Sequence, residues 1–197
     1  MTERFAFKGN AVTDQHSKIE PNETGGPAMR EVRDSVVVRF AGDSGDGMQL
    51  AGTQFTMENA LAGSDLATFP DYPAEIRAPA GTTYGVSSFQ IHFGAVDVKT
   101  AGDELDVLVA LNPAALKVNL RDLRIGGTVV ADSGSFTARN LAKAEYEGSP
   151  LEDDTLAPYQ VIQLDIGQLT TNAVEHLGLS SRDALRSRNM WALGLLL

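Results

Sequence analysis

Three glycines lie close together where an apolar run of the chain gives way to a helical pattern. Val36, Val37 and Val38 form that run, and the segment Gly42–Gly47, here called the glycine turn, follows it. Glycine lets the backbone turn sharply and leaves N–H groups unshielded. A helix that begins there directs the positive end of its dipole at the turn, which favours an anion, most often phosphate. The candidate ligand-binding residues are therefore Gly42, Asp43, Ser44, Gly45, Asp46 and Gly47.

The spacing of these glycines matches neither common nucleotide fingerprint. It is not G-x-G-x-x-G, and it is not a P-loop, because no lysine follows the last glycine. Asp43 and Asp46 also bring negative charge to an anion site, although either carboxylate could instead cap the helix. A tight strand–helix turn without a ligand stays open as an alternative. A thiamine diphosphate and magnesium site is rejected, because its second motif would fall on Asp71–Pro73, which contains no asparagine.

Composition limits the classes of function. A chain of 197 residues suits one domain with a full core. The net charge of -10 argues against nucleic acid as a partner. With no cysteine, the chain has no cysteine-bound iron–sulfur cluster or zinc of its own. No apolar run suits a bilayer and no signal-peptide pattern is present, so we expect a cytoplasmic protein without membrane contact.

The hydrophobic pattern predicts an α/β domain over residues 35–197, preceded by a disordered tail over residues 1–34. Buried strands that alternate with helices are typical of a Rossmann-like, three-layer fold with a mostly parallel sheet. Strands are predicted at 35–40, 65–69, 87–93, 106–111, 128–132 and 161–166. Helices are predicted at 46–62, 112–123, 168–177 and 182–196, with Gly63 as a C-cap and Asn112-Pro113 as a helix start.

Some residues have a predicted role within this pattern. Gly126-Gly127 is expected to end the second helical unit, and the strand at 87–93 is expected to have one apolar and one polar face. His92 lies on the polar face and is interpreted as a hydrogen-bonded sheet histidine. Pro70, Pro73 and Pro79 exclude a long helix or a central strand there, so we expect the short strand at 65–69 to lead into an ordered functional loop that extends to residue 83.

Three blocks of sequence together resemble a known family. Ala41–Gly47, Asp71–Gly81 and Asp106–Pro113 are similar, in order and spacing, to the gamma-type domain of 2-oxoacid:ferredoxin oxidoreductases. The likeness is greatest to the N-terminal part of the alpha subunit of the 2-oxoglutarate type. It covers residues 35–197. The segment Arg188–Gly194 resembles the one that runs on into the pyrimidine-type domain, so we expect the chain to be truncated before that domain.

The resemblance implies a role in a larger enzyme. The family decarboxylates a 2-oxoacid on thiamine diphosphate, passes electrons through iron–sulfur clusters to ferredoxin and forms an acyl-CoA. For this domain it implies coenzyme A handling at the glycine turn, without catalytic residues or metal ligands and without activity alone. Thiamine diphosphate, magnesium and the iron–sulfur cluster are then held by the partners: a thiamine-binding beta subunit and the pyrimidine-type alpha domain.

Two residues have more than one interpretation. Ser44 replaces a glycine of the family's G-x-G-G-x-G pattern, and its hydroxyl either donates to a phosphate or caps the helix. Arg77 is the candidate for a bidentate ion pair with a coenzyme A phosphate. Its alternative is a salt bridge with Glu75 or with another domain. At the level of the whole chain, a structural docking module of the same complex and a free-standing Rossmann-like nucleotide-binding protein remain alternatives.

Overall fold

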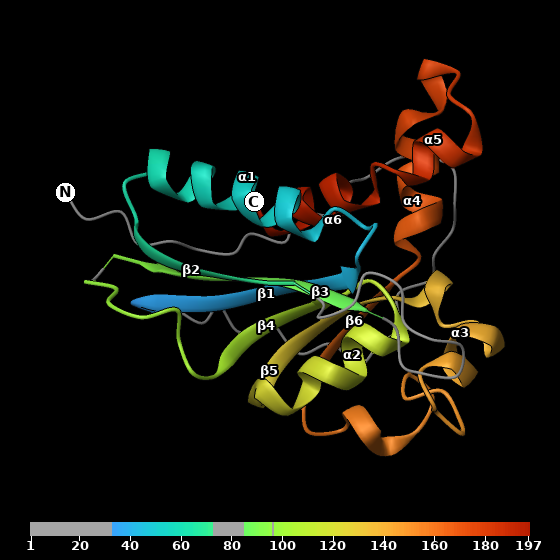
Figure 1. Ribbon diagram of the computed structural model, residues 1–197, viewed down its shortest axis with the longest axis horizontal. Coiled ribbons are helices and arrows are strands. Elements are labelled where there is room, and N and C mark those ends of the chain that lie inside the picture. The colour runs from blue at the N-terminus through green and yellow to red at the C-terminus, as the bar shows by residue number, and fades with distance from the viewer. Residues whose placement is uncertain (1–32, 73–84, 96) are drawn as a thin grey trace, which may run out of the picture. The chain divides into compact units, whose positions relative to one another are not determined.

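The triple-valine segment forms the central strand of a six-stranded sheet. In the computed structural model, which describes residues 33–72, 85–95 and 97–197, β1 comprises Ser35–Asp43. It pairs antiparallel with β3 (Val86–Gly94) and parallel with β4 (Leu105–Ala110). The strand order is β2-β3-β1-β4-β5-β6 (Figure 1). The predicted first strand is confirmed and extends to the first aspartate of the glycine turn.

The outer strands complete a mixed, mostly parallel sheet. β2 (Asp65–Asp71) lies at one edge, antiparallel to β3, and includes Pro70, as an edge strand can. On the other side, β5 (Leu123–Asp132) is parallel to β4, and β6 (Gln160–Leu164) is parallel to β5. Three of the five strand pairings are therefore parallel, which confirms the predicted α/β fold class.

Helices cover both faces of the sheet in three layers (Figure 1). α1 (Met48–Leu61) and α6 (Arg188–Leu196) lie on one face, and α2 (Pro113–Asn119) lies on the other. The remaining helices are α3 (Ala138–Lys143), α4 (Ile166–Val174) and α5 (Ser181–Leu185). Short 3-10 helices are η1 (Leu120–Asp122), η2 (Ser133–Ser135), η3 (Asp154–Leu156) and η4 (Glu175–Leu177).

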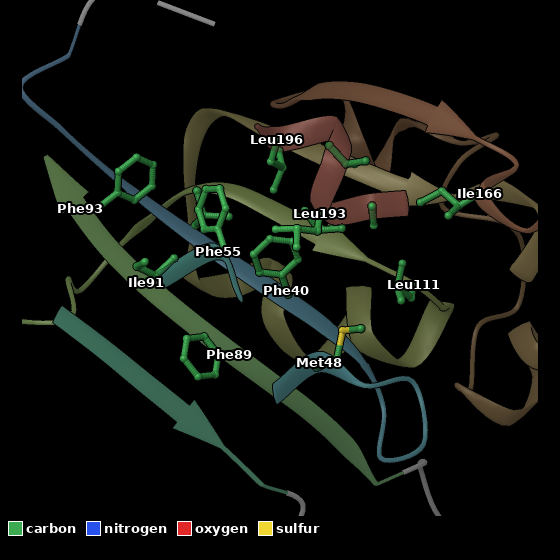
Figure 2. Packing of buried hydrophobic residues seen from close by; sticks show 14 residues of the cluster. Phe40, Met48, Phe55, Phe89, Ile91, Phe93, Leu111, Ile166, Leu193 and Leu196 are labelled. Atoms are coloured by element: carbon green, nitrogen blue, oxygen red, sulfur yellow. The ribbon is translucent and has the colours of Figure 1, made fainter. Parts of the chain in front are cut away.

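The alternation of side chains along β1 builds two cores. Val38 and Phe40 face the α1 and α6 layer, whereas Val37 and Ala41 face the α2 layer. In the first core, the ring of Phe55 meets Phe40 and Phe93 edge to face, with centroid distances of 5.6 and 5.3 Å (Figure 2). The burial of β1 on both faces explains why its sequence is a continuous apolar run.

The last helix contributes to the same core. Leu193 and Leu196 are buried and lie among the residues of the first core (Figure 2), whereas Leu197 is 70% exposed. The sequence predicts one helix over 182–196, and this is wrong. The helix ends at Leu185 and a new one begins at Arg188. The polar residues between them contain no proline or glycine, so the sequence gives no sign of the break.

One further prediction is corrected by the structure. Gly126-Gly127 lies inside β5, because the strand begins at Leu123 and shifts register against β4 between Leu105 and Val107. The predicted division of β3 into an apolar and a polar face is confirmed, and the polar face is buried as well. Gln90 is 3% exposed and accepts hydrogen bonds from the Arg39 guanidinium at 2.6 and 3.0 Å. Burial of this side is possible because these polar groups satisfy one another.

Other local predictions hold. His92 is a hydrogen-bonded sheet histidine, with Nδ1 2.8 Å from the Thr100 carbonyl and Nε2 3.0 Å from the Ser35 hydroxyl. Asn112 caps α2 by accepting from the Ala115 N–H, and Pro113 is the first helical residue. Gly63 follows α1 with a φ of 85°, as a C-terminal glycine does. The tail at 1–32 and the proline loop at 73–84 lie outside the described residues.

The structure predicts different effects of alanine on stability at two helical glycines. A Cβ at Gly52 of α1 would lie 2.1 Å from the Phe89 ring, whereas a Cβ at Gly194 of α6 would meet nothing within 4 Å. We expect Gly52→Ala to lower the free energy of unfolding by about 1–3 kcal/mol through overpacking. Gly194→Ala should leave it unchanged or raise it by up to about 1 kcal/mol. Urea unfolding measures both, and equal effects would contradict this packing.

Candidate functional site

The glycine turn lies at the carboxyl edge of the parallel strands. It joins β1 to α1 and neighbours the ends of β4 and β5, where Asn112 and Asp132 are located. The Leu111 N–H donates to the Ala41 carbonyl at 2.9 Å, which ties the end of β4 to the start of the turn. In open α/β sheets, ligands bind beyond this edge. The predicted site therefore occupies the position that the fold favours for a ligand.

The aspartates of the turn are bound to its own backbone. Asp46 Oδ2 accepts from the Asp43 N–H at 2.9 Å, and the Asp46 N–H donates to the Asp43 carbonyl at 2.9 Å. Asp43 Oδ1 accepts from the Ser44 N–H at 2.9 Å. The turn therefore does not leave all its N–H groups unshielded, as the sequence predicts. Within the described part of the chain, the N–H groups of Gly45 and Gly47 have no acceptor.

The start of α1 is not capped by a side chain. Gly47 holds the N-cap position, and the described hydrogen bonds of Asp43, Ser44 and Asp46 do not reach the first N–H groups of the helix. The capping roles considered for these residues are therefore wrong. The other role of Ser44, donation to a ligand, stays a prediction.

The three glycines differ in what surrounds them. A Cβ at Gly42 would lie 2.9 Å from Asp46 Oδ2 and 3.2 Å from Met48 Sδ. Gly47 has a φ of 73°, and its Cβ would lie 2.5 Å from Asn189 Nδ2. Packing and backbone geometry therefore explain these two glycines. Gly45 is exposed and has open space around it, so packing does not explain it.

A small polar cavity of about 120 Å3 adjoins the turn. Asp43 and Asp46 line it on one side, and Asn112, Ser135 and Asn140 line it elsewhere. On this measure about 10–15 Å3 is enough for one water, so the cavity has room for a small polar group.

Arg188 of α6 is the cation of this cavity, and sequence reasoning missed it. Its guanidinium makes a short ion pair with Asp46 Oδ1 and lies 3.7 Å from Asp132 Oδ2 and 3.4 Å from the Ser135 hydroxyl. The sequence instead points to Arg77, which lies outside the described residues. Arg188 is separated from Asp46 by 142 positions, so no local spacing could have joined them.

Asp132 is the buried partner in this group, with 1% of its surface exposed. Burial raises the pKa of its carboxyl above the usual value of 3.8. The hydroxyl of Ser135, the charge of Arg188 and the N–H of Ile166 act in the opposite direction and only partly offset that effect on the pKa. The carboxyl is thus held at the end of β5 by hydrogen bonds from η2 and α4 and by the charge of Arg188 of α6.

The described residues offer neither a metal centre nor a membrane segment. Among them, no group of three or more histidine, aspartate or glutamate side chains is arranged to hold a metal ion. Within the same part of the chain, no helix is both long enough and apolar enough to cross a bilayer.

Comparison with known proteins identifies the family. Residues 37–197 match the family model described as pyruvate ferredoxin/flavodoxin oxidoreductase. The chain belongs to this family. The matched range contains all of the described helices and nearly all of the sheet, including the glycine turn and Arg188. The family resemblance inferred from the three sequence blocks is therefore confirmed.

The 2-oxoglutarate oxidoreductase subunit KorA of Mycobacterium tuberculosis is 58% identical to this chain over 167 residues. The match covers 85% of this chain but 26% of KorA, so the chain spans about a quarter of that relative's length.

Two solved structures have a similar fold. One is a 2-oxoglutarate:ferredoxin oxidoreductase from Magnetococcus marinus with 2-oxoglutarate, coenzyme A and succinyl-CoA bound. Its TM-score is 0.61 at 24% identity, over 82% of this chain and 24% of that one. The other is the gamma subunit of a keto/oxoacid ferredoxin oxidoreductase from Geobacter sulfurreducens. Its TM-score is 0.55 at 22% identity, over 81% of this chain and 73% of that one. At these identities the likeness shows the fold.

The raised pKa of Asp132 predicts how stability depends on pH. Because the folded state binds this proton more tightly than the unfolded state, the charged carboxylate costs stability as the pH rises from 3.8 through the folded-state pKa. We expect Asp132→Asn to gain stability relative to the unsubstituted protein over that interval and to keep a constant difference above it. Urea unfolding across a pH series measures this difference.

Asp153 provides a comparison of opposite sign. Hydrogen bonds from Thr155 lower the pKa of its exposed carboxyl below 3.8. The unsubstituted protein should therefore lose stability relative to Asp153→Asn as the pH falls from 3.8 through the folded-state pKa. If the stabilities of Asp132→Asn and Asp153→Asn depended on pH in the same way, burial would not be what raises the pKa of Asp132.

Proposed function

We propose that this chain is the coenzyme A-handling, gamma-type domain of a 2-oxoglutarate:ferredoxin oxidoreductase. The enzyme would decarboxylate 2-oxoglutarate oxidatively, form its acyl-CoA and pass the electrons to ferredoxin. The observation that carries the proposal is the 58% identity to KorA, whose name states a 2-oxoglutarate oxidoreductase. The Magnetococcus marinus enzyme, which shares the fold, was solved with coenzyme A and succinyl-CoA bound.

The geometry of the glycine turn supports an anionic ligand. Among the described residues, the N–H groups of Gly45 and Gly47 have no acceptor, and the 14-residue helix α1 begins at the turn without a side-chain cap. A helix N-terminus with free N–H groups attracts phosphate. The negative charge of Asp46, which argues against such a ligand, is paired with Arg188. Gly45, which packing does not explain, leaves the approach to these N–H groups open.

The chemistry of the reaction is assigned to other parts of the enzyme. This chain has no cysteine for an iron–sulfur cluster, and its described residues present no metal-binding group for the magnesium of thiamine diphosphate. We therefore propose that thiamine diphosphate, magnesium and the iron–sulfur cluster are bound by a thiamine-binding beta subunit and by a pyrimidine-type alpha domain. The residues of this chain bind and orient coenzyme A, and the domain is inactive alone.

Arg77 is proposed as a second phosphate contact. A guanidinium binds a phosphate through two parallel hydrogen bonds, which a lysine cannot do. Arg77→Lys should therefore keep part of the coenzyme A affinity, and Arg77→Ala should lose more. If Arg77 instead forms a salt bridge with Glu75 or with another domain, Arg77→Ala will disrupt assembly on gel filtration and leave the affinity of the remaining complex unchanged.

A docking role is the second candidate, and one observation favours it. Leu50, Met57 and Leu61 of α1 are 55, 57 and 80% exposed. Their spacing of seven and four residues places them on one side of the helix, away from the core. An apolar stripe of this kind marks a protein contact. The two roles are compatible, because the stripe runs along the side of α1 and the glycine turn precedes its N-terminus.

Phenylalanine at Gly45 tests the ligand role without disturbing the fold. A Cβ at Gly45 meets nothing within 4 Å, so the ring can extend over the turn and block a bound phosphate. In the complex with the thiamine-binding subunit, we expect Gly45→Phe to weaken coenzyme A binding by at least about tenfold, the loss expected when charge-assisted hydrogen bonds are removed. Titration calorimetry measures the affinity.

Gly148→Phe is the matched control. Gly148 is also exposed and open, but it lies between α3 and β6 and does not line the cavity. The complex that carries Gly148→Phe should bind coenzyme A with the same affinity as the unsubstituted complex. The ligand role fails if Gly45→Phe and Gly148→Phe bind equally well, or if the unsubstituted complex shows no binding. In that case the docking role would remain.

A further inference from the structure

The first two residues of α6, Arg188 and Asn189, contact the last two residues of the glycine turn, Asp46 and Gly47. Asn189 is 4% exposed, and its Nδ2 donates to the Gly47 carbonyl at 3.2 Å. Its Oδ1 accepts from the Met190 N–H at 3.0 Å, which fixes the orientation of the amide. Because a Cβ at Gly47 would lie 2.5 Å from Nδ2, the last residue of the turn is fitted to this side chain.

Arg188 holds the turn through Asp46. One oxygen of the Asp46 carboxylate pairs with the guanidinium, and the other accepts from the Asp43 N–H at 2.9 Å. The carboxylate thus links α6 to the backbone of the turn. Its side chain is 12% exposed, so the link lies largely out of solvent. Charge-assisted hydrogen bonds of this kind are stronger than neutral ones.

The same guanidinium also reaches the end of β5. Its Nη1 lies 3.7 Å from Asp132 Oδ2 and 3.4 Å from the Ser135 hydroxyl. β1 and β5 are not neighbours, because β4 lies between them in the sheet. The backbone hydrogen bonds of the sheet therefore do not join β1 to β5 directly. Arg188 links the glycine turn, which follows β1, to the end of β5.

The position of α6 is fixed by its packing. Ala192, Leu193 and Leu196 are buried in the core that contains Phe40 and Phe55 (Figure 2). The helix therefore carries Arg188 and Asn189 on a rigid support. A displacement of α6 would withdraw both contacts from the turn together.

We propose that Arg188 and Asn189 are positioning residues for the glycine turn. They hold Asp46 and Gly47 in the arrangement that binds coenzyme A, and so they make the affinity for coenzyme A depend on the placement of α6. This inference rests on the proposed function. It means that the conformation of the glycine turn depends on a helix 142 residues away in the chain and not on the sequence of the turn alone.

The test compares variants in the complex with the thiamine-binding subunit. Arg188→Met removes the charge and keeps the length, Arg188→Lys keeps the charge, and Asn189→Ala removes the amide. Arg186→Met is the control, because Arg186 is 79% exposed and its recorded ion pair is with Asp183 of the neighbouring turn at 3.9 Å. The measurements are the coenzyme A dissociation constant, the KM for coenzyme A and for 2-oxoglutarate, and hydrogen exchange of the Asp43 and Asp46 amides.

We expect Arg188→Met and Asn189→Ala to raise the dissociation constant and the KM for coenzyme A by about tenfold. The KM for 2-oxoglutarate should not change, the turn amides should exchange faster, and Arg188→Lys should restore part of the loss. Because Arg188 acts through Asp46, Arg188→Met combined with Asp46→Asn should be little worse than Arg188→Met alone. Arg186→Met should match the unsubstituted complex.

Two results would overturn the inference: unchanged coenzyme A affinity in Arg188→Met and Asn189→Ala, or additive effects of Arg188→Met and Asp46→Asn. If the unsubstituted complex does not bind coenzyme A, the proposed function fails. Hydrogen exchange of the turn amides then tests by itself whether α6 holds the glycine turn. Faster exchange in the two variants would still support control of the turn by α6, and unchanged exchange would refute it. If Arg188→Met does not fold, Asn189→Ala supplies the same measurements without removing a charge.

Discussion

Two carboxylates at the carboxyl edge of the sheet depend on one guanidinium. Asp132 is almost fully buried, and Asp46 is held between the turn backbone and Arg188. Buried carboxylates are tolerated where hydrogen bonds and an opposite charge compensate them. Arg188 provides that charge for both groups from α6. The site after β1, the end of β5 and the last helix are therefore parts of one electrostatic arrangement.

This arrangement depends in turn on how β1 is buried. Its side chains alternate between the two cores, so helices must cover both faces of the sheet. α6 shares one face with α1 and fills the first core with Leu193 and Leu196. The packing that stabilises the domain is thus also what places Arg188 beside the turn. A core substitution that moved α6 would therefore change the contacts of the glycine turn without changing any residue of the turn.

The sequence predicts those features that local patterns determine. The strand at β1, the helix after the glycine turn, the cap at Asn112 and the parallel α/β class follow from side-chain periodicity and capping residues. The bulge that places Gly126 inside β5 and the break before Arg188 depend on tertiary packing instead. The partnership of Arg188 with Asp46 joins distant positions, and no periodic or spacing rule connects them.

The two aspartates of the turn looked unfavourable for an anion when only their charge was considered. Their contacts change that conclusion. Asp43 and Asp46 bind N–H groups of the turn itself, and Asp46 is also neutralised by Arg188. The turn is thereby held by its own carboxylates together with Arg188, while the N–H groups of Gly45 and Gly47 have no acceptor among the described residues. Of the three glycines, Gly42 and Gly47 are then required by the fold, and Gly45 is the one that packing does not explain.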